Sequence, residues 1–189
     1  MDYIVADKTL ISAKEEKYYS EKIIYLPDTY QPNEENKAIL DSNLSKEKHG
    51  LPENKFIFCC FNSHQKINPE MFLAWIKILK QKKDSVLWLL KDNKFSEKNL
   101  KNALSDQGLD PKRLIFADHV PLDQHLARLK LADLLLDTYP YNAHTSCSDA
   151  LRMNLPVVTL KGKSFASRVA ASLINTISMG ELITNNFDE

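Results

Sequence analysis

Short apolar runs alternate with longer helical patterns along residues 55–189. The runs predict five strands, over Phe56–Phe61, Val86–Leu90, Leu114–Ala117, Leu134–Asp137 and Pro156–Leu160. Continuous apolar runs of this length are typical of strands that are covered on both faces in a parallel sheet. The remaining stretches predict helices over Pro69–Lys82, Ser96–Gln107, Leu122–Leu131, Ser146–Met153 and Ser167–Ile177. This alternation predicts an α/β fold with a Rossmann-like, doubly wound parallel sheet, whose carboxyl-end loops all lie at one edge.

Residues 1–54 lack this alternation. Scattered apolar residues are followed by a polar stretch around Gln31–Lys37 and a segment rich in Ser, Lys and Glu over Ser42–Gly50. We therefore predict two parts, an arm with a linker over 1–54 and a Rossmann-like lobe over 55–189. A chain of 189 residues is long enough for one domain with a full core.

Composition narrows the classes of function. The chain carries 25 basic and 25 acidic side chains, which argues against a strongly electrostatic surface for nucleic acid or membrane. Its cysteines, Cys59, Cys60 and Cys147, lack metal-site spacing and suit a reducing compartment. No apolar run approaches the roughly 20 residues of a membrane span, and residues 1–20 lack the apolar core of a signal peptide. We expect a cytoplasmic protein without a metal, a nucleic-acid partner or membrane attachment.

The segment from Asp137 to Leu151 joins a buried strand to a helix through a loop suited to an anion. A helix that begins after a parallel strand presents free N–H groups and a positive dipole end, where phosphate binds readily. His144, Thr145 and Ser146 add side-chain donors, and Asp149 is placed to accept hydrogen bonds from ribose hydroxyls. The plainer alternatives are a loop histidine bonded to the backbone at 144 and a dipole-complementing acid at 149.

Those same residues resemble a known family. His144-Thr145-Ser146 with Asp149, followed by Leu155–Thr159 and Phe165–Ser172, is similar to the donor-binding lobe of the O-GlcNAc transferases, inverting UDP-sugar enzymes with a two-lobed GT-B fold. Further segments are similar in the same order: Met1–Ile4 with Tyr19–Lys22, Phe61-Asn62 with Lys66, Ile67 and Pro69, and Ser85–Leu90. The resemblance covers nearly the whole chain, and the order and spacing of its pieces make it specific.

The resemblance assigns roles to individual residues. Lys66 would meet the β-phosphate as the catalytic cation, although its spacing alone favours a solvated loop lysine. His125 and Arg128, one turn apart on a helix, would hold the ribose and the base, with an ordinary surface helix as the alternative. The implied binding set for the nucleotide-sugar is Ser63, Lys66, His125, Arg128, His144, Thr145, Ser146 and Asp149.

Three positions depart from the family's pattern. Ser63 stands where the family has glutamine near the phosphates, so this contact is shortened or missing. Leu122 replaces a lysine beside the uracil, and Ala143 replaces a common glycine at the diphosphate.

The resemblance implies the donor-binding part of an inverting, metal-independent glycosyltransferase. Such an enzyme moves GlcNAc from UDP-GlcNAc to Ser or Thr of a protein acceptor. Residues 1–54 would be the end of the acceptor-side lobe, and the chain looks like a truncated catalytic region, because no 34-residue repeat and no general base are visible. Alternatives are a GT-B transferase for another sugar or a small acceptor, and a non-catalytic UDP-binding or interaction module.

Overall fold

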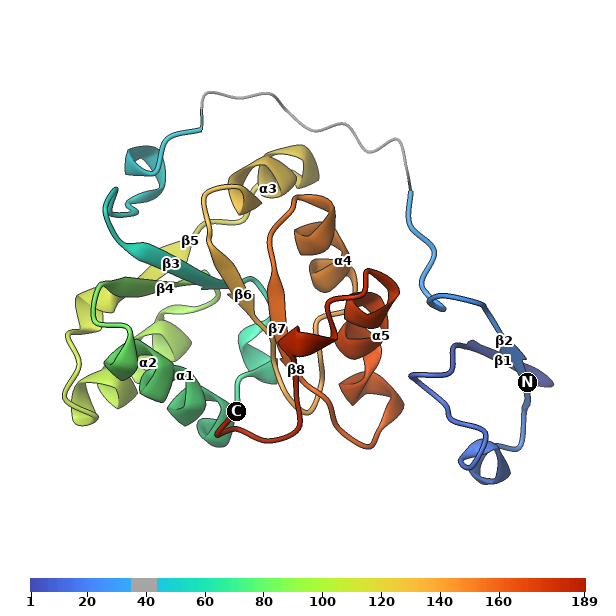
Figure 1. Cartoon of the computed structure of the whole chain (residues 1–189). Coiled ribbons are helices and arrows are strands. Elements are labelled where there is room, and N and C mark those ends of the chain that lie inside the picture. Colours follow the sequence, from blue (N-terminus) through green and yellow to red (C-terminus); the bar gives the residue numbers. More distant parts are fainter. Residues whose placement is uncertain (35–43) are drawn as a thin grey trace.

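A computed structural model describes residues 1–34 and 44–189 (Figure 1). Its main sheet has six strands in the order β5-β4-β3-β6-β7-β8, and every neighbouring pair is parallel. The strands are β3 Phe56–Cys60, β4 Ser85–Leu90, β5 Leu114–Ala117, β6 Leu134–Leu136, β7 Val157–Leu160 and β8 Ile183–Thr184. The helices are α1 Pro69–Gln81, α2 Lys94–Asp106, α3 Leu122–Leu129, α4 Thr145–Arg152 and α5 Val169–Thr176. The predicted doubly wound α/β fold is confirmed.

Side-chain caps set where the helices begin. The Asn93 side chain accepts hydrogen bonds from the N–H groups of Phe95 and Ser96, so α2 begins two residues before the predicted start. Asn68 caps α1 in the same way, just ahead of a proline that suits the first turn. The short strand β8 was missed, because two residues are too few to form a sequence pattern.

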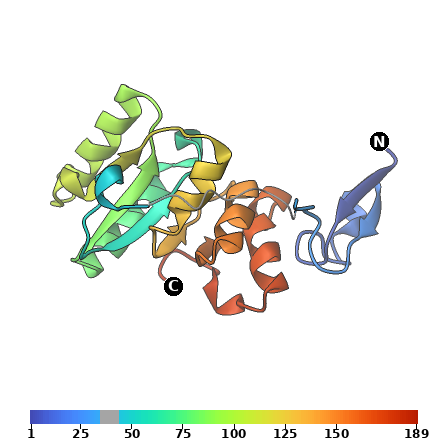
Figure 2. The same cartoon turned by 90° about the horizontal axis from the view of Figure 1, so that it is seen from above.

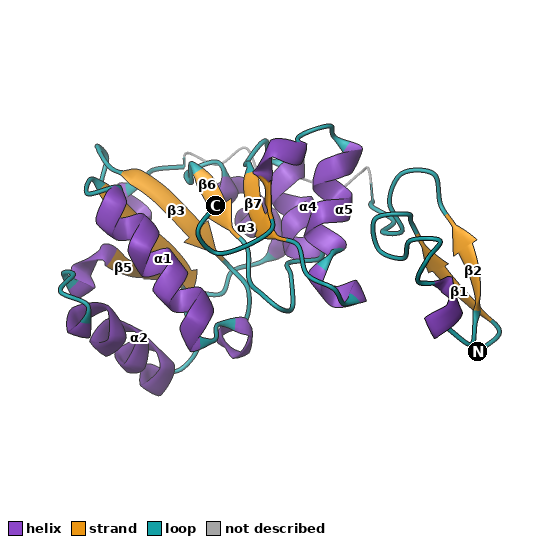
Figure 3. Ribbon diagram, turned by 60° about the horizontal axis from the view of Figure 1, so that its bottom comes forward, coloured by secondary structure: helices purple, strands orange, loops and turns teal. Residues whose placement is uncertain are grey.

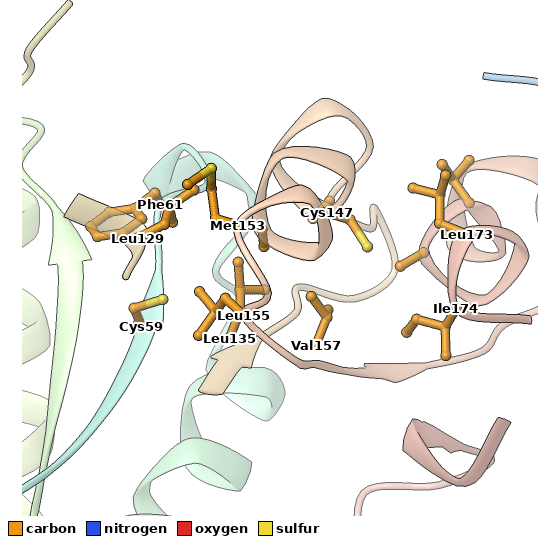
Figure 4. Close-up of a cluster of buried hydrophobic side chains, with 14 of the residues drawn as sticks. Cys59, Phe61, Leu129, Leu135, Cys147, Met153, Leu155, Val157, Leu173 and Ile174 are labelled. Carbon is orange, nitrogen blue, oxygen red and sulfur yellow. The ribbon is translucent and has the colours of Figure 1, made fainter. Parts of the chain in front are cut away.

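Helices cover both faces of the sheet, with α1 and α2 on one face and α3, α4 and α5 on the other (Figures 1 and 3). Neighbouring residues of β3 point to opposite sides, so Cys59 and Cys60 belong to two separate apolar clusters. In the first cluster, side chains from β3, β6, β7, α4 and α5 meet (Figure 4). Buried contacts on both faces therefore hold the strands and fix where their carboxyl ends lie.

The arm has structure of its own. Strands β1 Tyr3–Ala6 and β2 Lys22–Tyr25 form a parallel pair that the sequence pattern did not reveal. The arm contacts the lobe at α5 (Figure 2): the buried Asp7 carboxylate accepts a hydrogen bond of 2.6 Å from the Ser172 hydroxyl.

A second contact joins Arg168 to both carboxylate oxygens of Glu15, at 2.7 and 2.6 Å. The bonds from Arg168 hold the pKa of Glu15 at about 2. Residues 35–43 of the predicted linker lie outside the described residues.

The middle of the sheet contains a topological switch point. Strands β3 and β6 are neighbours, yet the chain continues from β3 to β4 on one side and from β6 to β7 on the other. Open parallel sheets bind ligands in the crevice at the carboxyl ends of such strands. The loops after β3 and β6 border this crevice.

The loop after β6 is anchored by one buried carboxylate, that of Asp137. Its Oδ1 accepts hydrogen bonds from the N–H groups of Thr138 at 2.7 Å and Ala143 at 2.6 Å. Its Oδ2 accepts a bond of 2.6 Å from the hydroxyl of Thr159 in β7. Burial raises the pKa of Asp137 to about 7, although all three hydrogen bonds act to lower it. The segment 138–143 of the loop is thereby closed against the sheet.

Removing this anchor should destabilise the fold. Asp137→Ala should lower the free energy of unfolding by roughly 3 kcal/mol, because two buried N–H groups and one hydroxyl lose their acceptor. Asp137→Asn should cost less, since its amide oxygen can still accept from both N–H groups and its NH2 can donate to Thr159. Urea denaturation of the two variants and the parent measures the difference, and equal costs would contradict this role.

The pH dependence of the Asp137→Asn variant tests the protonation of this carboxyl. The pKa of Asp137 is about 7 in the folded chain against a usual value of 3.8, so the folded state binds more protons between those values. The contribution of the protonated Asp137 to stability is fully present below the usual pKa of 3.8 and is lost as the pH rises through the folded-state pKa of about 7. The free energy of unfolding of the parent should exceed that of Asp137→Asn by a margin that shrinks by roughly 2 kcal/mol between about pH 5 and about pH 8. A margin independent of pH would contradict the assignment.

Candidate functional site

The crevice has one wall in the loop between β6 and α4. His144 occupies the N-cap position of α4, and Thr145 and Ser146 form its first turn. Within the described part of the chain no side chain caps this helix, so its first N–H groups have no side-chain acceptor. Thr145 is exposed and Ser146 is half-buried. The sequence prediction of a strand, a loop and a helix N-terminus at this place is confirmed.

The other wall is the loop after β3. It contains Ser63, which is exposed, followed by a turn of 3-10 helix over His64–Lys66. The Nζ of Lys66 donates a hydrogen bond of 3.0 Å to the carbonyl oxygen of Asn142. Lys66 is therefore half-buried and bonded to the opposite wall. Burial lowers the pKa of Lys66, and the nearby Asp137 acts in the opposite direction.

Asn62 joins the two walls through its side-chain amide. Its side-chain NH2 donates to the hydroxyl of Thr138 at 2.9 Å, and its amide oxygen accepts from the hydroxyl of Ser146 at 2.9 Å. Asn62 is buried, so these bonds are sheltered from water. Segments more than 70 residues apart are thereby held in one arrangement.

His144 contacts a third segment. Its Nε2 lies 3.3 Å from the carbonyl oxygen of Ala166, which can only accept, so this nitrogen carries the proton. The backbone-bonded loop histidine weighed from the sequence is therefore present. The bond uses the only N–H of the neutral ring, so its Nδ1 can accept a hydrogen bond from a ligand but cannot donate one to a phosphate. Burial lowers the pKa of His144.

The helix α3 presents His125 and Arg128 on a shared face, but at different depths. Arg128 is only 2% exposed, and its guanidinium lies 4.7 Å from the centre of the Phe61 ring. Its Nη1 donates to the carbonyl oxygen of Asp118 at 2.6 Å, and its Nη2 lies 2.9 Å from the Nδ1 of His125. The guanidinium is thus packed beneath His125. The ordinary surface helix considered from the sequence does not describe Arg128.

These contacts control the charge of His125. Arg128 carries only donors, so the Nδ1 of His125 accepts and the proton of the neutral ring sits on Nε2. Burial, and then the charge of Arg128, lowers the pKa of His125 to about 4. The ring is therefore neutral at pH 7. Asp149, buried in α4, lies close enough to raise that pKa.

The structure brings the predicted residues to one edge of the sheet in two groups. The loops after β3 and β6 hold the first group, Ser63, Lys66, His144, Thr145 and Ser146. Helices α3 and α4 hold the second group, His125, Arg128 and Asp149. Of the departures from the family's pattern, Leu122 is 49% exposed at the start of α3. Ala143 is fully buried, and its N–H is bonded to Asp137.

Sequence reasoning missed four residues that shape the site. Asp137 directly follows β6 and Asn62 comes two residues after β3, and these positions at the ends of apolar strands were a signal that could have found them. Tyr141 and Asn142 lie inside the loop, where no pattern distinguishes them. Their importance comes from contacts with Lys66.

The described residues lack both a metal cluster and a membrane-spanning helix. Residues 1–34 and 44–189 contain no group of three or more His, Cys, Asp or Glu side chains arranged to hold a metal ion. Over the same ranges, no helix is long and apolar enough to cross a membrane.

Comparisons with known proteins agree with this geometry. The profile of the family described as Glycosyl transferase family 41 matches residues 31–189. Over 195 residues the chain is 37% identical to the probable UDP-N-acetylglucosamine–peptide N-acetylglucosaminyltransferase SEC of Arabidopsis thaliana, an alignment that covers 100% of this chain and 20% of that protein. It is also 37% identical, over 77% of its length, to 13% of the UDP-N-acetylglucosamine–peptide N-acetylglucosaminyltransferase of Caenorhabditis elegans.

A solved structure extends the likeness to three dimensions. A mutant O-GlcNAc transferase of Thermobaculum terrenum superposes with a TM-score of 0.87 at 29% identity, over 100% of this chain and 35% of that one. The chain spans a fifth or less of the length of the two curated relatives. Because the family profile matches most of the chain and the fold agrees throughout, the chain belongs to glycosyl transferase family 41 and has the fold of part of a GT-B O-GlcNAc transferase.

Proposed function

We propose that this chain is the donor-binding part of an inverting, metal-independent glycosyltransferase that moves GlcNAc from UDP-GlcNAc to Ser or Thr of a protein acceptor. One observation carries the proposal. The Lys66 ammonium lies 3.0 Å from the Asn142 carbonyl oxygen, two residues before the N-cap of α4. A cation, a helix N-terminus and two hydroxyls therefore converge at the switch point of a parallel sheet, where a diphosphate would be stabilised.

The first group of residues would bind the diphosphate. The acceptor hydroxyl attacks C1 of the sugar and gives its proton to a base supplied by the other lobe or by the donor itself. The bond from C1 to the β-phosphate oxygen breaks, and UDP leaves with the electron pair of that bond. In our proposal Lys66 meets the β-phosphate, while the backbone N–H groups of His144, Thr145 and Ser146 and the hydroxyl of Thr145 contact the phosphates beside the α4 dipole. Fixed donors of this kind stabilise a leaving diphosphate without a metal ion, because they are in place before the charge develops. Ser63 is exposed at the same edge and would make a shorter contact.

The second group would bind the nucleoside. Asp149 and the neutral His125 are proposed to contact the ribose, with His125 offering its Nε2–H. Arg128 stays on the base side of the site, and its bonds to His125 and Asp118 make it a residue that orients His125. Leu122, half-exposed at the start of α3, would pack against the uracil.

The relatives support this substrate class by name. Both curated relatives are named as transferring N-acetylglucosamine from its UDP derivative to peptide. The docking of the arm on α5 through Asp7 and Glu15 supports the proposal that residues 1–54 are the end of an acceptor-side lobe. We also propose a cytoplasmic location, which is supported by three buried free thiols that suit a reducing compartment.

The proposal predicts that the chain binds UDP without a divalent cation. Lys66, the helix N-terminus and the hydroxyls supply the stabilising groups, so affinity should be the same in buffer with magnesium and in buffer with a chelator. Isothermal titration calorimetry with UDP measures both. Loss of binding in the chelator would contradict the metal-free mechanism, and a complete lack of UDP binding would contradict the proposal.

A second prediction concerns Lys66. Lys66→Met should weaken UDP binding by about 30-fold, because a charge-assisted contact to a phosphate is worth about 2 kcal/mol. Its thermal unfolding midpoint should stay close to the parent's. Lys80→Met is the matched control, since Lys80 is an exposed lysine of α1, away from the crevice. Equal UDP affinity in the two variants would make Lys66 a structural lysine.

A separate assay of sugar transfer addresses catalysis. UDP binding with no transfer in the full-length protein would favour the non-catalytic alternative.

A further inference from the structure

Tyr141 makes ring contacts with two residues of the proposed phosphate site. It lies in the loop between β6 and α4 and is 48% exposed. Its ring stacks on that of His144, with centres 4.8 Å apart and planes at 18°. The Lys66 ammonium lies over the same ring, 4.0 Å from its centre. The Tyr141 ring is therefore shared by the cation and the imidazole that would face the phosphates.

These contacts act on a side chain that needs positioning. An ammonium group on a four-carbon stem has many rotamers and three N–H donors. One donor of Lys66 is used by the Asn142 carbonyl oxygen at 3.0 Å. The face of an aromatic ring attracts a cation without accepting a conventional hydrogen bond. The ring and the carbonyl together hold the ammonium in place and leave it able to donate to a further acceptor.

We propose that Tyr141 is a positioning residue that holds Lys66 and His144 for the terminal phosphate of a nucleoside diphosphate. This inference rests on the proposed function and deepens it. It makes the discrimination between UDP and UMP by Lys66 depend in part on an aromatic ring at position 141. Both contacts use the ring, so phenylalanine should replace tyrosine, whereas an aliphatic side chain of similar size should not.

The competing interpretation is that the ring blocks the site. In that case a phosphate would have to displace the Tyr141 ring from Lys66, and a variant without the ring would bind UDP more tightly. Displacement would break the stacking on His144 and the contact with Lys66 together. The double contact therefore favours positioning, and the sign of the change in affinity separates the two interpretations.

The test is calorimetry of the parent, Tyr141→Phe and Tyr141→Leu with UDP and with UMP. Tyr141→Leu should weaken UDP binding by about fivefold, in line with a lost cation–π contact, and leave UMP binding within about twofold. Tyr141→Phe should match the parent for both ligands. In the Lys66→Met background, Tyr141→Leu should cause little further loss, because the ring acts through the lysine.

A measurement on the parent guards against a variant that fails to fold. The ring protons of Tyr141 should shift in the NMR spectrum when UDP is added, and much less when UMP is added. Unchanged or tighter UDP binding by Tyr141→Leu, an equal loss of UMP binding, or equal ring shifts with both ligands would overturn the inference. If the parent binds no UDP, the proposed function and the inference fail together. If the parent binds UDP but the UDP-to-UMP ratio does not depend on the ring, only the inference fails.

Discussion

The hydrogen bonds accepted by the buried carboxylate of Asp137 determine the shape of the site. They close the loop after β6 by joining the N–H groups of Thr138 and Ala143 to one oxygen, while the other oxygen is joined to β7. The closed loop places the Asn142 carbonyl where Lys66 can reach it and starts α4 at the crevice. The carboxylate is buried in the closed loop, and this burial raises its pKa. Shape and charge at this edge therefore depend on the same group.

Electrostatics at the crevice follow from unequal burial. Lys66 is half-buried and bonded to one carbonyl oxygen, so its ammonium remains available to an anion. His125 is kept neutral by burial and by the guanidinium beneath it. One side of the site thus offers positive charge and a helix dipole, whereas the other offers neutral donors and the acid Asp149. This division suits a ligand that has a charged diphosphate at one end and an uncharged nucleoside at the other.

The sequence was sufficient for five of the six strands of the main sheet and for the edge where the site lies. Apolar runs identify strands that are covered on both faces, and parallel strands bring their following loops together. His144, Thr145 and Ser146 could be placed from that argument alone. Lys66 could not, because a loop lysine has no pattern of its own, and the family resemblance was needed to select it.

Other features depend on contacts between distant segments. The pairing of β1 with β2 and the bond from Ser172 to Asp7 depend on where the arm lies, which no local pattern encodes. The burial of Arg128 was not predicted, because helical spacing shows which residues share a face but not what covers that face. Its guanidinium is buried against Phe61, beneath His125. The contacts of Tyr141 with Lys66 and His144 likewise form only when the loops that follow β3 and β6 have come together.

The central claim is that the crevice between the β3 and β6 loops binds the diphosphate of a UDP donor. The most direct test is to follow backbone and side-chain amide resonances of the chain by NMR during titration with UDP. We expect the largest shifts in the backbone amides of Ala143, His144, Thr145 and Ser146 and in the side-chain amide of Asn62. Shifts concentrated instead on α1 and the C-terminal residues, with the β6–α4 loop unchanged, would contradict the account.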